Sequence, residues 1–229
     1  MAGFDVLSSL SRAGLALFAF ATSVVFFFSY INKTTARKFG ITMLFILASS
    51  VVLFKAMDTI IERFNNASED SANTRLRLAI VAKNMADDKT LGIGLNNYGL
   101  KTNPPYWYGD HLPINQFVIN PNTGEVQQGI VETIYLLIAA ETGWHNLVVF
   151  LTFLFTMYFR NFRNFLALKE HEYRWVTIGL LGGLLAIYIQ SSLEWVLKQT
   201  HNFYQLMFVF AIIGAVSRLI DKEDKKSEV

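Results

Sequence analysis

Three arginines of this sequence have the charge and the placement to bind a phosphate group. Arg12 stands at the start of an apolar segment, whereas Arg75 and Arg77 lie on a polar stretch between apolar segments. A guanidinium presents a planar fork of N–H donors that fits phosphate oxygens. Residues two apart on a helix point roughly 200° apart, so only one of Arg75 and Arg77 is expected to face a shared site. Judged by charge alone, simple anchoring at a membrane–water interface is the favoured alternative for all three.

Two glutamates interrupt the apolar segment 129–159. Glu132 and Glu141 are about two and a half helical turns apart, so on a regular helix they would point to opposite faces rather than form an acid–base pair. Carboxylates in such segments usually face a bundle interior or a water-filled cavity. Glu141 and His145 are spaced to meet on one face, unless Gly143 breaks the helix. A purely structural polar contact between helices explains these residues about as well as catalysis does.

His111 is isolated in a stretch without helical periodicity, and no second ligand stands at a spacing typical of a metal site. The chain has no cysteine, which excludes disulfides, thiolate nucleophiles and thiolate metal sites. We therefore expect no metal and no cofactor. The net charge of +2, without a basic stripe interleaved with aromatics, argues against a nucleic-acid partner.

Residues 91–99 form a glycine-rich turn that contains Gly92, Gly94 and Asn96. It resembles a phosphate-binding loop only superficially, because the lysine of that motif is missing and no strand precedes it. We expect the glycines to allow positive φ angles or a close approach of another backbone segment.

The elements that must position these residues are membrane-spanning helices. Hydrophobic residues make up 52% of the chain and charged residues only 17%, whereas soluble domains carry roughly 25% charged residues. Five segments, with their flanks, can span a bilayer as helices: residues 13–31, 39–54 with an extension to 61, 129–159, 175–193 and 203–216.

Lysine and arginine concentrate in alternate connections between these segments, namely 32–38, 160–174 and the tail after residue 217. The positive-inside rule places such connections in the cytoplasm. The predicted fold is therefore an all-α polytopic bundle of about five spans with one long periplasmic loop. Its parts are residues 1–57 with two spans, 58–128 as the loop, 129–220 with three spans, and a cytoplasmic tail at 221–229.

The loop has internal organisation of its own. Residues 66–72 are predicted as a turn, after which Asn73 caps a helix that runs to about Asp87. One face of this helix carries Leu78, Val81, Ala82 and Met85, and another carries Leu76, Ile80 and Lys83. The helix is expected to lie on the membrane surface or to pack on the bundle. Residues 102–128 hold all four prolines of the chain and are expected to be irregular.

Four pieces of the chain, in this order, resemble the O-antigen ligase and polymerase superfamily of bacterial membrane glycosyltransferases. They are Ser-Arg-Ala-Gly at 11–14, Arg75 followed by the stretch 87–98, Tyr-Leu at 135–136 followed by Ala-Glu-Thr-Gly-Trp at 140–144, and Leu-Glu-Trp at 193–195. The resemblance implies transfer of a glycan from undecaprenyl diphosphate to lipid A-core or another glycan acceptor, at the outer face of the bacterial inner membrane. It selects Arg12 and Arg75 as the diphosphate-binding pair.

The chain departs from the family at the residue proposed to be catalytic. A histidine and an asparagine usually precede the Tyr-Leu pair, and here those positions are Glu132 and Thr133. The candidates for the catalytic role are therefore Glu132, His111 and Glu141. Family members also carry more spans before the Ser-Arg element, so the chain resembles a C-terminal half.

Such a half would act as a metal-independent glycosyltransferase when a separate N-terminal membrane half supplies the missing helices. The open alternatives are a polymerase of the same superfamily and a non-enzymatic, truncated membrane component. A transporter with Glu132, Glu141 and Glu194 as an ion path is disfavoured, because no inverted repeat is visible.

Overall fold

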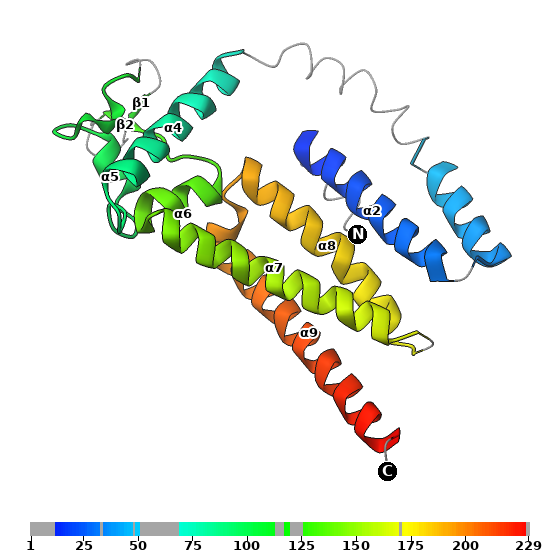
Figure 1. Ribbon diagram of the computed structural model, residues 1–229. Coiled ribbons are helices and arrows are strands. Elements are labelled where there is room, and N and C mark those ends of the chain that lie inside the picture. The colour runs from blue at the N-terminus through cyan, green and yellow to red at the C-terminus, as the bar shows by residue number, and fades with distance from the viewer. Residues whose placement is uncertain are drawn as a thin grey trace. The chain divides into compact units, whose positions relative to one another are not determined.

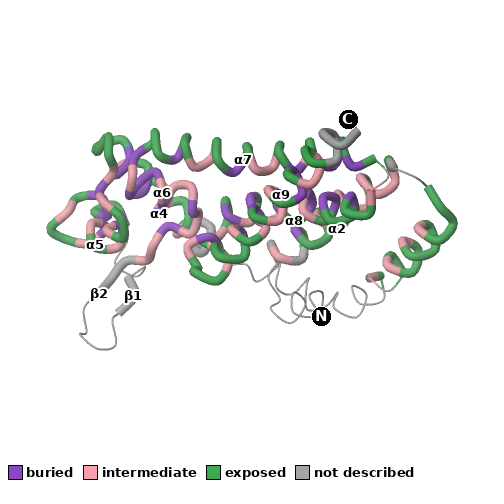
Figure 2. Tube along the Cα trace, turned by 90° about the horizontal axis from the view of Figure 1, so that it is seen from below, coloured by how far each residue is buried: buried purple, intermediate pink, exposed green. Residues whose placement is uncertain are grey.

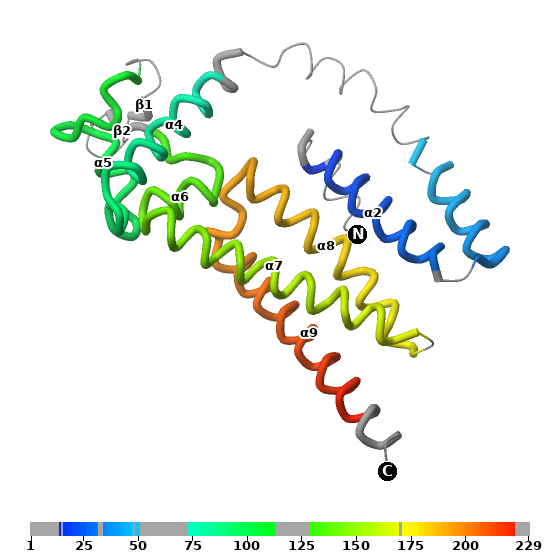
Figure 3. Tube along the Cα trace, in the orientation of Figure 1, coloured from blue at the N-terminus to red at the C-terminus, as the bar shows by residue number. Residues whose placement is uncertain are grey.

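The computed structural model describes residues 12–32, 34–47, 49–50, 69–112, 117–119, 126–169 and 171–227 (Figure 1). Figure 3 traces the chain in the same orientation as a tube that runs from blue near the N-terminus to red near the C-terminus. Most of this part of the chain is helical, as the sequence predicts (Figure 1). The helices are α2 (Arg12–Asn32), an unlabelled helix at 36–47, α4 (Glu69–Asp88), α5 (Tyr98–Thr102), η1 (Trp107–Gly109), α6 (Ile134–Thr142), α7 (Trp144–Ala167), α8 (Arg174–Leu193), η3 (Val196–Lys198) and α9 (Thr200–Ser227).

The stretch 102–128, predicted to be irregular, contains regular structure. It holds α5's last residue, η1, and the antiparallel strands β1 (Phe117–Ile119) and β2 (Val126–Gln128), in which Phe117 pairs with Gln128. Pro104 and Pro105 precede η1, and neither strand contains a proline, so no hydrogen-bond donor is missing from the pairing.

The chain divides into two compact units. The first, which we call the helix unit, is formed by the described parts of Met1–Ala67, Met157–Ile189 and Leu206–Val229. The second, the loop unit, is formed by the described parts of Ser68–Thr156 and Gln190–Gln205. Each unit is described by itself.

The helix unit is built around a small apolar core of Phe165, Ile178 and Leu181. Phe28 of α2 packs edge-on against Phe165, with ring centroids 5.2 Å apart. A β-carbon at Gly182 would lie 2.8 Å from the carbonyl oxygen of Ala21, so glycine permits the close approach of α2 and α8. The apolar faces of these three helices therefore meet at small residues and aromatic rings.

Polar bonds join α7 to the two helices that follow it. The Asn161 side-chain amide donates to the carbonyl oxygen of Thr177 at 3.0 Å, and that of Asn164 donates to Ile213 at 3.0 Å. Arg160 Nε donates to the Ser217 hydroxyl at 3.0 Å. These bonds fix one end of α7 against α8 and α9.

Among the residues that the structure describes, two helices are long and apolar enough to cross a membrane by length and composition. They are Arg174–Leu193, with a mean hydropathy of 1.7, and Thr200–Lys222, with a mean hydropathy of 1.8. They coincide with the fourth and fifth predicted spans. The apolar helix Ala16–Ile31 in α2 is shorter, and much of the second predicted span lies outside the described residues.

The third predicted span, 129–159, is not one continuous helix. Gly143 adopts φ 88° and ends α6, with its N–H bonded to the carbonyl oxygen of Ala139 at 2.8 Å. A new helix, α7, starts at Trp144. A left-handed glycine is a common way to end a helix, and a hydropathy pattern does not register it because both flanks are apolar.

In the loop unit α4 packs on α6. The predicted division of this helix into two faces is confirmed, since Leu78, Val81, Ala82 and Met85 are buried, while Leu76 and Ile80 are exposed. Figure 2 shows this division as buried segments on α4 and α6. The predicted start of the helix is wrong: residues 69–72 are helical, and Asn73 lies inside α4 rather than capping it.

Candidate functional site

The glycine turn after α4 is fastened to the end of α6. The backbone N–H of Ile93 donates to the carbonyl oxygen of Ala140 at 2.9 Å, and the backbone N–H of Gly94 donates to the carbonyl oxygen of Glu141 at 3.0 Å. A β-carbon on Gly92 would collide with the backbone of Glu141 and Thr142. The turn thus lies directly on the α6 backbone.

The conformation of the turn explains its composition. Gly92, Gly94 and Asn96 have φ angles of 71°, 95° and 60°. Residues other than glycine and asparagine rarely adopt positive φ angles. Both predicted uses of the glycines, positive φ and close backbone approach, are confirmed.

Glu141 supports this turn from inside the unit. Its side chain is only 7% exposed, and its Oε1 lies 3.5 Å from the backbone nitrogen of Tyr98, the first residue of α5. Because Gly143 breaks the helix, Glu141 and His145 do not share one helix. Glu141 therefore holds the turn and α5 in place, and a catalytic role for it stays a prediction.

The structure brings Arg75 and Glu132 together. Arg75 Nε lies 2.7 Å from Glu132 Oε2, with 51% and 34% of the two side chains exposed. Arg75 projects from α4. Glu132 follows buried Val131 and stands two residues before α6 begins, so both flanks fix its backbone. The pair lies at the surface of the unit, where a ligand can reach it.

This pairing leaves part of the guanidinium available. A guanidinium carries five N–H donors, and within the described residues Glu132 is the one recorded partner of Arg75. The terminal amino groups of Arg75 can therefore donate to the oxygens of an anionic ligand while Nε remains bound to Glu132.

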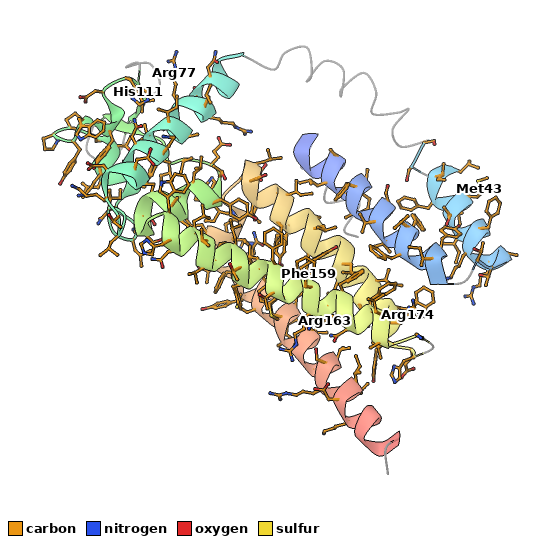
Figure 4. All side chains as sticks on the ribbon, viewed as in Figure 1. Met43, Arg77, His111, Phe159, Arg163 and Arg174 are labelled. Carbon is orange, nitrogen blue, oxygen red and sulfur yellow. The ribbon has the colours of Figure 1, made fainter. Side chains whose placement is uncertain are left out.

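The remaining predicted site residues are placed as follows. Arg12 is the first residue of α2, in the helix unit, and its side chain lies outside the described residues. Arg77 is partly buried on α4, and His111 is exposed just after η1 (Figure 4). Within the described residues no hydrogen bond or ion pair links His111 to Arg75 or Glu132.

Two aspartates at the end of α4 form contacts that the sequence analysis missed. Asp87 Oδ1 accepts the indole N–H of Trp144 at 2.8 Å, and Asp88 Oδ2 accepts the Tyr108 hydroxyl at 2.6 Å. They connect α4 to the start of α7 and to η1. Their position in the stretch 87–98 was the only signal, and it does not identify their partners.

These bonds change how the groups titrate. The hydrogen bond from Tyr108, followed by that from Lys89, lowers the pKa of Asp88. Burial and the bond to Asp88 raise the pKa of Tyr108 to about 12. The hydrogen bonds from Lys83 and Trp144 lower the pKa of Asp87. Near neutral pH, both aspartates are charged acceptors that hold the end of α4.

No group of three or more His, Cys, Asp or Glu side chains in the described ranges is placed to hold a metal ion. The candidate site consists instead of one cation, Arg75, and one carboxylate, Glu132, and the glycine turn is bonded to the opposite end of α6.

Comparison with known protein families identifies the family of this chain. Residues 1–151, more than half of the chain, match the family model described as O-antigen ligase. The chain belongs to the O-antigen ligase family. No curated protein and no solved structure gives a significant match.

Membership of the O-antigen ligase family confirms the predicted resemblance, and three of the four sequence pieces lie within the matched residues, whereas Leu-Glu-Trp at 193–195 lies outside them. The matched residues include α4, the glycine turn, Glu132 and α6. The family indicates a ligase- or polymerase-type function with glycan and lipid-linked substrates in general. Together with the two apolar helices α8 and α9, it also indicates a membrane protein.

Proposed function

We propose that this chain is an O-antigen ligase-type glycosyltransferase, or the C-terminal part of one. It transfers a glycan from undecaprenyl diphosphate to lipid A-core or another glycan acceptor at the periplasmic face of the bacterial inner membrane. The observation that carries the proposal is the partly exposed Arg75–Glu132 pair, which lies within the residues matched to the family.

In this mechanism Arg75 binds the donor diphosphate. An oxygen of the acceptor hydroxyl forms a bond to the anomeric carbon of the donor glycan, and the bond from that carbon to the diphosphate oxygen breaks. Negative charge develops on the leaving diphosphate, where the terminal N–H donors of Arg75 stabilise it. Arg12 contributes a second guanidinium, as the family resemblance implies.

Glu132 serves the same step in two ways. Its Oε2 holds Arg75 Nε at 2.7 Å, which restricts the rotamers of the arginine and orients its fork. Its second carboxylate oxygen can accept the proton that the acceptor hydroxyl loses. His111 is the other candidate for that proton, since it is exposed on the same unit.

The test compares Arg75 with Arg77, its neighbour on the same helix. In cells that depend on this gene, Arg75→Ala should reduce surface glycan attachment by about 10²-fold or more, the usual effect of removing a group that stabilises transition-state charge. Arg75→Lys should restore only part of it, since lysine lacks the fork. Arg77→Ala is the matched control and should stay close to wild type.

Membrane levels of each variant are measured alongside. Unchanged glycan attachment in Arg75→Ala, with the protein present at its normal level, would contradict the proposal. The products separate ligase from polymerase: a ligase joins glycan to lipid A-core, whereas a polymerase lengthens the glycan that remains on its lipid carrier.

A further inference from the structure

Two leucines of the glycine turn are unusually exposed for a rigid segment. Leu91 and Leu95 are 76% and 75% exposed, whereas Ile93 between them is only 7% exposed. The turn is held by backbone bonds from Ile93 and Gly94 to the end of α6. Ile93 thus anchors the turn inward, and the fold holds the two leucines outward as a fixed apolar pair.

The connection between α8 and α9 locates a membrane face on this unit. Both helices are candidate spans, so the residues that join them must lie at one surface of the bilayer. Within that connection η3 packs against α6, and the Thr133 hydroxyl lies 3.5 Å from the carbonyl oxygen of Ser191 near the end of α8. Trp195, also in the connection, is exposed, as is typical of tryptophan at a membrane interface. The start of α6 therefore lies at that surface.

The other end of α6 shows the same features. Trp144 begins α7 and is exposed, and it is followed on α7 by the exposed apolar side chains Val148, Val149 and Phe153. An interfacial tryptophan followed by an apolar exposed face is the pattern of a helix entering lipid. Thr90, next to Leu91, places its carbonyl oxygen against Gly143, the residue before Trp144. The turn therefore lies at the level of Trp144.

From this arrangement we infer that Leu91 and Leu95 insert into the bilayer interface, on the face where the α8–α9 connection lies. The occupant of this apolar pair is lipid. Transfer of a leucine side chain from water to an apolar environment is favourable, so two leucines fix the height of the turn on the bilayer. Because the turn is bonded to α6 and follows α4, it would also keep the Arg75–Glu132 pair close to the membrane surface. The inference stands on the fold and does not require the proposed reaction.

The chain contains no cysteine, so single labels can be introduced without a background. Leu91→Cys and Leu95→Cys are each labelled with an environment-sensitive fluorophore, and the full chain is reconstituted in vesicles of phosphatidylethanolamine and phosphatidylglycerol. Asp110→Cys, at an exposed polar position after η1, is the matched control. Quenchers attached to lipid chains and a soluble iodide quencher report on the two environments.

We expect blue-shifted emission and strong quenching by the lipid-borne quenchers at positions 91 and 95, with weak quenching by iodide. The control should show the reverse. Iodide quenching at 91 and 95 equal to that of the control would overturn the inference. So would protection from both quenchers, because the leucines would then be covered by a second polypeptide. Since the two positions are independent, either labelled variant suffices if the other fails to accumulate.

Discussion

At the scale of single residues, Gly143 separates α6 from α7 and lies against the residue that precedes the glycine turn. It has φ 88°, and a β-carbon there would collide with the carbonyl oxygen of Thr90. Gly143→Ala should therefore destabilise the protein by about 1–3 kcal/mol, from backbone strain and displacement of the turn. Thermal unfolding in detergent, followed by circular dichroism, measures the loss.

The control for this substitution is Gly183→Ala in α8, where, apart from its chain neighbours and the adjacent backbone of its own helix, no atom lies within 4 Å of the added carbon. Alanine is favoured over glycine inside a helix, so the control should be neutral or slightly stabilising. Equal unfolding temperatures for the two variants would show that the turn does not require glycine at position 143.

Sequence reasoning predicted some of these residues and missed others for a physical reason. The positive φ of Gly92 and Gly94 follows from a property of glycine itself, so composition was enough to predict it. The contact between Arg75 and Glu132 depends on how α4 packs on α6, which no local pattern encodes. Glu132 was predicted as a substitute for a histidine, and its bond to Arg75 was not.

At the scale of elements, the Asp88–Tyr108 bond joins α4 to η1 and should make this junction sensitive to pH. The folded state lowers the pKa of Asp88, so the stabilisation is fully present above the ordinary carboxyl value of 3.8 and is lost as pH falls through the lower folded value. Asp88→Asn should therefore unfold at a lower temperature than wild type at pH 7. The difference in unfolding temperature between wild type and Asp88→Asn should become smaller as the pH falls below 3.8, the ordinary pKa of the carboxyl group.

Thermal unfolding at pH 7 and at a pH below 3.8 provides the measurement. Asp110→Asn is the control because the exposed side chain of Asp110 has no hydrogen-bond or ion-pair partner among the described residues. A gap between wild type and Asp88→Asn that stays the same at both pH values would mean that the charge of Asp88 does not contribute.

The elements themselves were predicted unevenly. Apolar length was sufficient for α8 and α9, and the side-chain period correctly divided α4 into two faces, without indicating which of them is buried. Boundaries failed where local chemistry competes: Asn73 is a good cap by type, yet the helix begins at Glu69. The sequence analysis left open whether Gly143 breaks the helix, because one glycine in an apolar segment is compatible with either a continuous or a broken helix.

At the scale of the whole molecule, the distribution of positive charge predicts which side of the membrane each end of the chain faces. In the helix unit the bonds from Arg160 to Ser217 and from Asn161 to Thr177 place basic Arg160, Arg174 and Arg218 at the same end of α7, α8 and α9. The positive-inside rule assigns such an end to the cytoplasm.

A green fluorescent protein fused after Val229 should therefore fluoresce, because it folds to its fluorescent form in the cytoplasm. Alkaline phosphatase at the same point should be inactive, and the same reporter inserted beside Asp110 should be active, since the loop is predicted to be periplasmic. Active phosphatase at the C-terminus would invert the topology and move the Arg75–Glu132 pair to the cytoplasmic face, where a periplasmic ligase reaction is impossible.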